Sequence, residues 1–290
     1  MLLPFPSNPQ PCRPNAPLMP VDHAALIALG ERLGAQAWPG FLVLLALLTL
    51  VAGIAAWGFE HLRRRRAAQP EPGAGLLFGG LAIGAAAVLA LAWVFAEVAE
   101  GLGNGRPMGL LDETISHSVG VNTPPGVREV FSWLTHLADP ITVVLLCTGV
   151  AIALWLRGHR GFAAGWVAAT VGNALLNHML KHIFERARPV HDFGFAQVSG
   201  YSFPSGHSSG SMVLYGMLGY LGLRMLPARW RVPSVMAATA VIVTVACSRI
   251  FVRAHFPSDV LAGLCSGAAW LAICIASIEY ARHHRGTDRR

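Results

Sequence analysis

The chain has 290 residues, of which 54% are hydrophobic and only 13% are charged, and its formal net charge is +7. Soluble domains carry about 25% charged residues, so this composition argues against a soluble protein and predicts a membrane protein. A positive net charge can indicate nucleic-acid binding, but no basic motif interleaved with aromatic residues occurs, so we expect no nucleic-acid partner. The five cysteines show neither CxxC nor Cys/His ligand spacing, which argues against a disulfide framework and a zinc site.

The first 20 residues are rich in proline and carry a single charge, Arg13. They lack the basic start and the apolar stretch of a signal peptide, so we expect them to stay on the chain in loose order. Residues 21–37 place apolar side chains at helical spacing, and Asp22 is a suitable N-cap. This segment is predicted to form an amphipathic helix on the membrane surface.

Seven apolar runs follow, each of a length that can cross a bilayer. The predicted fold class is therefore all-α, a polytopic membrane helix bundle with a six-span catalytic core and one extra N-terminal span. The first run can also be re-entrant, which would leave six spans. We divide the chain into an N-terminal extension, residues 1–70, and a membrane domain, residues 71–290. The runs cover residues 41–59, 76–96, 140–156, 161–183, 207–226, 232–250 and 258–279.

Two polar features interrupt this pattern. Residues 97–139 are polar by comparison, and apolar positions at helical spacing between residues 127 and 137 predict a short interfacial helix there. Such a helix either packs on its own protein or gates the access of lipid, and the sequence leaves both alternatives open. Within the run at 161–183, Asn173, Asn177 and His178 are predicted to link helices, because polar groups in a span usually face the bundle or a cavity, and a direct role in a site is the alternative.

Arginines gather in alternate loops between the runs, and basic loops face the cytoplasm. We therefore expect a multi-pass protein of the cytoplasmic membrane, with its N-terminus outside and its C-terminus in the cytoplasm. The segments 97–139 and 184–204, which lie between the basic loops, are then extracytoplasmic. The basic segments are residues 63–66, 157–160, 224–231 and 282–290.

The first of three polar clusters is KHIFERARP, which contains Lys181, Arg188 and Pro189. Lys181 and Arg188 are seven residues apart, two turns of a helix, so both side chains can point the same way. Pro189 predicts the end of that helix. Two cations at one membrane edge are costly unless an anion pairs with them. For this cluster alone, side chains that snorkel to the interface are the alternative.

The second cluster, PSGH, opens the run that begins at residue 207. The start of a helix offers free N–H groups and the positive end of its dipole to an anion. Gly206 lets the backbone approach closely, Ser205 can add a hydroxyl donor, and His207 is placed to give a proton. A purely structural histidine is the alternative.

The third cluster runs from Ser248 and Arg249 to His255 and Asp259. One helical turn separates His255 from Asp259, so the carboxylate can hold one imidazole N–H and leave the other nitrogen free as a nucleophile. Pro257 suits the first turn of the next helix. An aspartate that only caps this helix is the alternative.

The combined pattern K-x6-RP, PSGH and SR-x5-H-x3-D resembles the type 2 phosphatidic acid phosphatase superfamily over about residues 76–280. The resemblance implies that His255 attacks phosphorus to form a phosphohistidine, that Asp259 orients it, and that His207 protonates the leaving oxygen. It also implies a reaction without metal or other cofactor, because fixed cations and backbone dipoles neutralise the developing charge. The residues it implies for phosphate binding are Lys181, Arg188, Ser205, Gly206 and Arg249.

These motifs predict an integral membrane phosphatase whose partners are a lipid phosphate substrate and the bilayer. Candidate substrates are phosphatidic acid, phosphatidylglycerophosphate and polyprenyl diphosphate, and we favour the last because its diphosphate must be hydrolysed outside. Transfer of the phosphoryl group to another lipid hydroxyl is one alternative. A transporter or scramblase that kept the anion site is another, which the complete pair of nucleophile and acid argues against. A vanadate-dependent haloperoxidase has similar motifs, but seven spans fit that soluble chemistry poorly.

Overall fold

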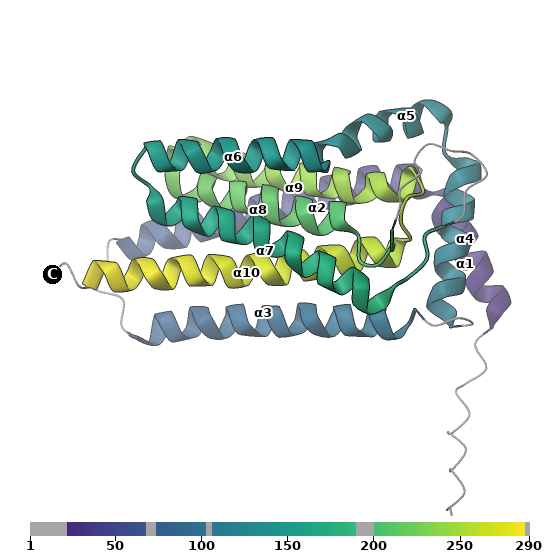
Figure 1. Ribbon diagram of the computed structural model, residues 1–290, viewed down its shortest axis with the longest axis horizontal. Helices are drawn as coiled ribbons and strands as arrows, with labels where there is room; N and C mark the ends of the chain where they lie inside the picture. Colours follow the sequence, from purple (N-terminus) through teal and green to yellow (C-terminus); the bar gives the residue numbers. More distant parts are fainter. Residues whose placement is uncertain (1–21, 68–73, 103–105, 190–199, 288–290) are drawn as a thin grey trace, which may run out of the picture.

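The computed structural model describes residues 22–67, 74–102, 106–189 and 200–287, and within them every regular element is a helix (Figure 1). The proline-rich N-terminal segment, predicted to be loosely ordered, lies outside the described residues. The helices are α1 (His23–Ala35), α2 (Ala37–Ala67), α3 (Ala74–Glu100), α4 (Pro107–Asn122), α5 (Pro125–Leu134), η1 (Thr135–Ala138), α6 (Pro140–Leu156), α7 (Arg160–Phe184), α8 (Gly206–Met225), α9 (Ala228–Phe251) and α10 (Pro257–Thr287).

Each of the seven predicted apolar runs falls on one helix: α2, α3 and α6 to α10. Among the described residues, α2, α9 and α10 are long and apolar enough to cross a membrane. A fourth span can be made by α5 and η1 together with α6, a pair bent by 41°. An all-α bundle with membrane-spanning helices is therefore confirmed, whereas seven spans and a six-span core stay predictions.

Polar side chains of α7 bond to α8 inside the bundle. The amide of Asn177 donates to Ser209 at 3.2 Å, and the amide of Asn173 reaches the same hydroxyl at 3.5 Å. Both asparagines are buried, so their predicted role as links between helices is confirmed. His178 is exposed instead and meets the ring of His182 on its own helix, so the prediction was wrong for this residue.

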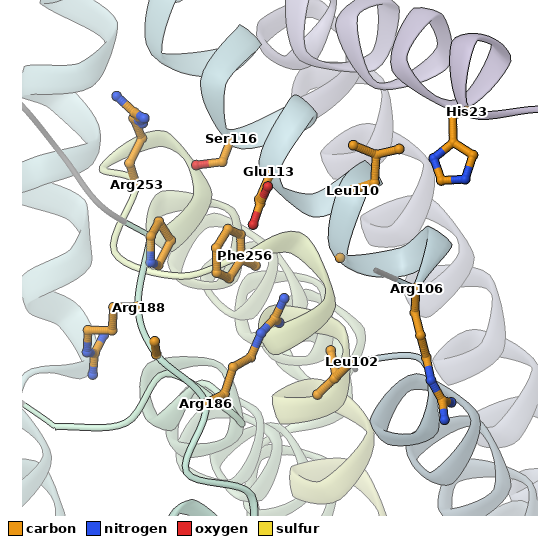
Figure 2. A pocket seen from close by; sticks show the side chains of 13 residues that line it. His23, Leu102, Arg106, Leu110, Glu113, Ser116, Arg186, Arg188, Arg253 and Phe256 are labelled. Carbon is orange, nitrogen blue, oxygen red and sulfur yellow. The ribbon is translucent and has the colours of Figure 1, made fainter. Parts of the chain in front are cut away.

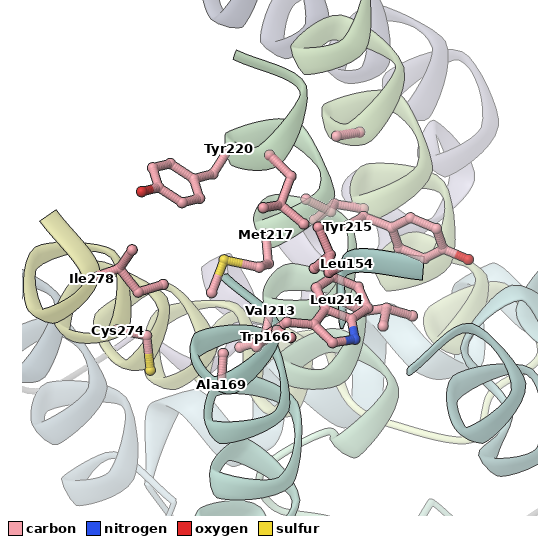
Figure 3. Packing of buried hydrophobic residues seen from close by; sticks show 14 residues of the cluster. Leu154, Trp166, Ala169, Val213, Leu214, Tyr215, Met217, Tyr220, Cys274 and Ile278 are labelled. Atoms are coloured by element: carbon pink, nitrogen blue, oxygen red, sulfur yellow. The ribbon is translucent and has the colours of Figure 1, made fainter. Parts of the chain in front are cut away.

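The largest apolar core lies between α6, α7, α8, α9 and α10 (Figure 3). Trp166 is fully buried there, and its indole N–H donates to the carbonyl of Cys147, so this large ring leaves no buried donor unpaired. Helix α10 approaches α7 closely because Gly172 has no side chain, and a Cβ at this position would lie 2.3 Å from the ring of Trp270. These contacts fix the relative positions of the helices whose ends carry the three clusters.

The basic loops and the polar clusters lie at opposite ends of the bundle (Figure 1). At the basic end, Arg231 at the start of α9 pairs with Glu60 near the end of α2 at 2.5 Å. Arg224 of α8 pairs there with Glu279 of α10. Charged loops at one end and the clusters at the other are the arrangement that the sequence predicted.

Helices α1 and α4 cross the other end of the bundle as a cap (Figure 1). The predicted helix α1 is confirmed, with the side chain of Asp22 accepting from the N–H groups of residues 24 and 25 at 3.0 and 3.2 Å. Two glycines on α1, Gly30 and Gly34, let it pack directly against Thr114 and Ser118 of α4.

Helix α4 was not predicted, because the sequence indicated only one short helix in the polar segment 97–139. That short helix is confirmed as α5 and η1. Its Phe131 is buried and stacks on Phe251 of α9 with ring centroids 4.2 Å apart, so α5 packs on its own protein. The described residues of this segment therefore form a folded cap over the bundle.

Candidate active site

The first cluster is not one continuous helix. Helix α7 ends at Phe184 because Glu185 adopts a left-handed conformation, with φ of 45°. Lys181 therefore lies in the last turn of α7, whereas Arg188 lies beyond it on chain without regular secondary structure. The prediction that both residues share a helical face up to Pro189 was wrong, because the break comes four residues earlier and turns Arg188 toward the α9–α10 connection.

Arg188 binds both sides of the site. Its guanidinium donates to the carbonyls of Gly200 and Ala254 at 3.0 and 2.9 Å, and it lies 3.2 Å from Nε2 of His255. Burial holds the pKa of Arg188 below its usual value. On the other side of the segment, the Lys181 ammonium donates to the carbonyl of Tyr201 at 2.5 Å.

The second cluster forms the start of α8. Ser205 is the N-cap, and its fully buried hydroxyl accepts from the Ser208 hydroxyl at 3.0 Å. The Ser205 N–H donates to the carbonyl of Asp259 at 3.0 Å, which ties this turn to the start of α10. A Cβ on Gly206 would lie 3.1 Å from the Asn177 amide oxygen, so glycine also serves a close approach to α7.

His207 lies in the first turn of α8 and is bound by a carboxylate that sequence reasoning missed. Its Nε2 lies 2.9 Å from Asp139, which also binds His136 at 2.5 Å. A carboxylate only accepts hydrogen bonds, so this contact assigns a proton to Nε2 of His207. Asp139 immediately precedes α6, where an aspartate is easily interpreted as an ordinary helix cap.

The third cluster brings His255 and Asp259 together as predicted. Nδ1 of His255 lies 3.4 Å from Asp259, whose other neighbours include the N–H of Phe256 at 3.0 Å. The Asp259 carboxylate therefore assigns the proton to Nδ1, and the lone pair of Nε2 faces Arg188. Burial lowers the pKa of the His255 imidazole to about 3, which keeps this ring neutral and nucleophilic.

Three cations converge on the space beside the two histidines. Lys181, Arg188 and Arg249 are close enough to repel one another electrostatically. The positive charges of Arg188 and Arg249 also disfavour the protonated forms of both His207 and His255. A charge inside a protein is usually paired with a charge of opposite sign. Three cations gathered without such partners therefore indicate a site for an anion.

The hydrogen bonds of these cations support the same interpretation. In the described part of the chain, Lys181 and Arg188 bond to neutral acceptors, and Arg249 donates to the hydroxyl of Thr135 at 2.7 Å. Arg249 is only 4% exposed, and its Nε has no partner among the described residues. An oxyanion in this space would supply the missing charge and the missing acceptor.

Sequence reasoning also missed the residue that supports Asp259. Arg186 donates to Asp259 at 2.6 Å, to Ser258 at 2.8 Å and to Asp112 of α4 at 2.8 Å. Its guanidinium also lies over the ring of Phe256, 4.3 Å from the centroid. The two aspartates and Arg186 form a buried carboxylate–guanidinium–carboxylate bridge that locks the α4 cap to the start of α10.

No group of three or more His, Cys, Asp or Glu side chains that could hold a metal ion occurs among the described residues. The carboxylates near the site are engaged elsewhere: Asp112 and Asp259 bind Arg186, and Asp139 binds two histidines. A reaction without metal stays a prediction that an experiment must test.

Comparison with known proteins agrees with this geometry. Residues 162–283 match the family model of the PAP2 superfamily, and this stretch contains every predicted site residue. Phosphatidylglycerophosphatase B of Bacillus subtilis is 31% identical over 164 residues, which cover 54% of this chain and 77% of that protein. Lipid A 1-phosphatase of Rhizobium etli is 31% identical over 186 residues, which cover 55% of this chain and 74% of that protein.

The fold is also that of a solved relative. The crystal structure of a transmembrane PAP2-type phosphatidylglycerolphosphate phosphatase from Bacillus subtilis superposes with a TM-score of 0.62 at 26% identity. The superposition covers 67% of this chain and 96% of that one. With its membrane-spanning helices and its three motifs in place, the chain is a multi-pass membrane protein that belongs to the PAP2 superfamily.

Proposed function

We propose that this protein is an integral membrane hydrolase that removes a phosphoryl group from a lipid phosphate or diphosphate through a phosphohistidine intermediate. The observation that carries the proposal is the state of His255. Its Nδ1 is held by Asp259, and its Nε2 lone pair faces Arg188 within a cluster of cations. A neutral nucleophile beside uncompensated positive charge suits attack on an anionic phosphate.

The first step forms one bond and breaks one. Nε2 of His255 attacks phosphorus, the bond from phosphorus to the lipid oxygen breaks, and His207 gives its proton to that oxygen. Asp139 keeps Nε2–H of His207, and the proton that is transferred comes from Nδ1 of the imidazolium, the form that the bound anionic substrate favours over the neutral ring. Lys181, Arg188 and Arg249 bind the three non-bridging oxygens as the charge on them redistributes.

The second step regenerates the enzyme. A water molecule attacks phosphorus, the phosphorus–nitrogen bond breaks, and His207 recovers its proton from that water. The products are the dephosphorylated lipid and inorganic phosphate. Fixed cations and the N–H groups at the start of α8 provide the electrostatic stabilisation in both steps.

The relatives guide the substrate class. Their names assign phosphatidylglycerophosphate and lipid A as substrates of those proteins. For this chain we propose a lipid phosphomonoester or diphosphate, with phosphatidylglycerophosphate, phosphatidic acid and polyprenyl diphosphate as the compounds to assay. We place the site on the extracytoplasmic face of the cytoplasmic membrane, because the arginine-rich loops lie at the opposite end of the bundle.

The two histidines give the sharpest test of this mechanism. A nucleophile is required whatever group leaves, whereas a general acid matters only when the leaving oxygen is a poor one. General acid catalysis is typically worth about 10²–10⁴-fold. We expect His207→Ala to lose activity of this order on a lipid phosphate and far less on nitrophenyl phosphate, whose leaving group needs no proton. His255→Ala should lose nearly all activity on both substrates.

The comparison is made within each variant, so a folding defect, which lowers both rates alike, cannot imitate it. The unmutated protein must first be shown to hydrolyse the aryl substrate. Selective activity on nitrophenyl phosphate in His255→Ala would exchange the two roles. Equal losses on both substrates in His207→Ala would leave that histidine a phosphate-binding residue and refute its role as the acid.

A further inference from the structure

A cavity of about 610 Å³ lies between the α4 cap and the segment that carries the two arginines of the first motif (Figure 2). Figure 2 shows Arg186 and Phe256 in the middle of its lining, with Arg188 on one side and Arg106 on the other. His23 contributes from α1, so the N-terminal extension closes part of this space. The cavity thus borders Arg188, which contacts the nucleophile His255, and extends under the cap.

The lining of this cavity is positively charged. Of its four arginines, Arg186 is compensated by two aspartates, so excess charge comes from Arg106 and Arg188. The hydrogen bonds of Arg106 and Arg188 in the described residues go to neutral acceptors. One carboxylate, Glu113, lines the same space and is exposed. This balance favours an anionic ligand.

A second and independent observation points to a ligand. Ser116 of α4 lines the cavity and is 3% exposed, yet its hydroxyl has no partner among the described residues. Buried polar groups are nearly always hydrogen-bonded, and an unmade bond costs stability. A phosphoryl oxygen in the cavity would accept from this hydroxyl.

We propose that this cavity is a subsite for a second phosphoryl group of the same lipid molecule. Arg188 connects the two sites, because it lines the cavity and lies 3.2 Å from Nε2 of His255. The phosphoryl group that is removed binds beside His255, and the phosphodiester of the same headgroup binds near Ser116 and Arg106. The proposal rests on the phosphatase function above and predicts a preference for phosphatidylglycerophosphate over phosphatidic acid, which has one phosphoryl group.

Binding to an inactive variant separates this proposal from catalysis. The full chain with His255→Gln is titrated in micelles with dioctanoyl phosphatidylglycerophosphate and with dioctanoyl phosphatidic acid by calorimetry. We expect the first lipid to bind at least about tenfold more tightly, as charge-assisted hydrogen bonds suggest. Adding Arg106→Ala should remove most of this preference and leave phosphatidic acid binding unchanged. Adding Glu113→Gln, which removes the opposing charge, should increase the preference.

Two serines on α4 provide the matched control. Ser116→Ala should lower the preference by about two- to tenfold without lowering the melting temperature, because its hydroxyl has no partner to lose. Ser118→Ala should lower the melting temperature and leave the lipid preference unchanged. Its hydroxyl donates to the carbonyl of Glu31 at 2.8 Å and lies outside the cavity lining.

Several results would overturn the subsite. Equal affinity for the two lipids would refute it. An equal loss of affinity for both lipids in the Arg106→Ala variant would also refute it. A preference that survives both Arg106→Ala and Ser116→Ala would also refute it. If the unmutated protein releases no phosphate while the binding preference persists, the phosphatase proposal fails and the anion subsite stands.

Discussion

Replacing Arg186 by methionine should destabilise the protein strongly, because this residue neutralises two buried carboxylates. Asp259 is fully buried and Asp112 is 2% exposed, and each lies within 2.8 Å of the guanidinium. Breaking a buried ion pair by removing one partner costs about 3–5 kcal/mol. We expect Arg186→Met to lower the free energy of unfolding by this amount at neutral pH.

The loss should depend on pH in a known direction. Burial raises the pKa of Asp112 above its usual value, and removing Arg186 takes away a positive charge that opposes this shift. A carboxyl whose pKa is raised on folding binds its proton more tightly in the folded state, so its contribution to stability is lost as pH rises through the folded pKa. The gap between Arg186→Met and the unmutated protein should therefore be larger at pH 8 than at pH 5.

A thermodynamic cycle with Asp112→Asn measures the bridge itself. Arg186→Met leaves two uncompensated carboxylates, whereas the double variant Arg186→Met, Asp112→Asn leaves one. The double variant should therefore lose less free energy of unfolding than the two single variants combined, by about 0.5–3 kcal/mol. Unfolding is followed in detergent micelles by tryptophan fluorescence during denaturant titration. Turnover should also fall, by about 10²-fold, because Asp259 no longer holds His255 in place.

Arg128→Met is the control, since the Arg128 guanidinium donates to a backbone carbonyl on the same side of the bundle and binds no carboxylate of this bridge. It should stay within about 0.5 kcal/mol of the unmutated protein. The reasoning would be refuted if Arg186→Met were equally mild, or if its effect were the same at pH 8 and pH 5.

Three further predictions test the orientation, the chemistry and the packing. A single cysteine at exposed Glu129 should react with an impermeant thiol reagent on intact cells, whereas one at exposed Arg229 should react only after permeabilisation; the opposite pattern would invert the topology. Phosphate release should survive EDTA and be blocked by vanadate, which mimics pentacoordinate phosphorus, and restoration by Mg²⁺ after loss in EDTA would contradict the metal-free reaction. Gly172→Ala should cost about 1–3 kcal/mol through overpacking against Trp270, while Gly149→Ala, with open space around it, should be neutral or stabilising.

Contacts within one cluster were predictable where the chain keeps a regular turn or helix, because local spacing then brings the residues together. His255 and Asp259 are one helical turn apart, and the contact between them follows from that spacing. The start of α8 at Gly206 follows from the PSGH sequence in the same way. Where local geometry departed from a regular helix, at Glu185, the same kind of reasoning failed for Lys181 and Arg188.

The supporting carboxylates could not be found in this way, because folding brings them from distant segments. Asp112 binds Ser258 across 146 residues of sequence, and Asp139 binds His207 across 68. No periodicity connects such positions. One signal did exist, since the first cluster contains a second arginine, Arg186, which the pattern K-x6-RP leaves unused and which needs a carboxylate partner once it is buried.

Arg186 and Arg188 show how the role of a guanidinium depends on its partners rather than on its position in a motif. They stand two residues apart on the same non-helical segment and both line the same cavity. Arg186 meets two carboxylates, so its charge is already neutralised and it can only hold the structure. Arg188 meets carbonyl groups and the lone pair of His255, so its charge remains available to a ligand. Exchanging their partners would exchange their roles, which is why the aspartate on the α4 cap matters to an active site that it does not touch.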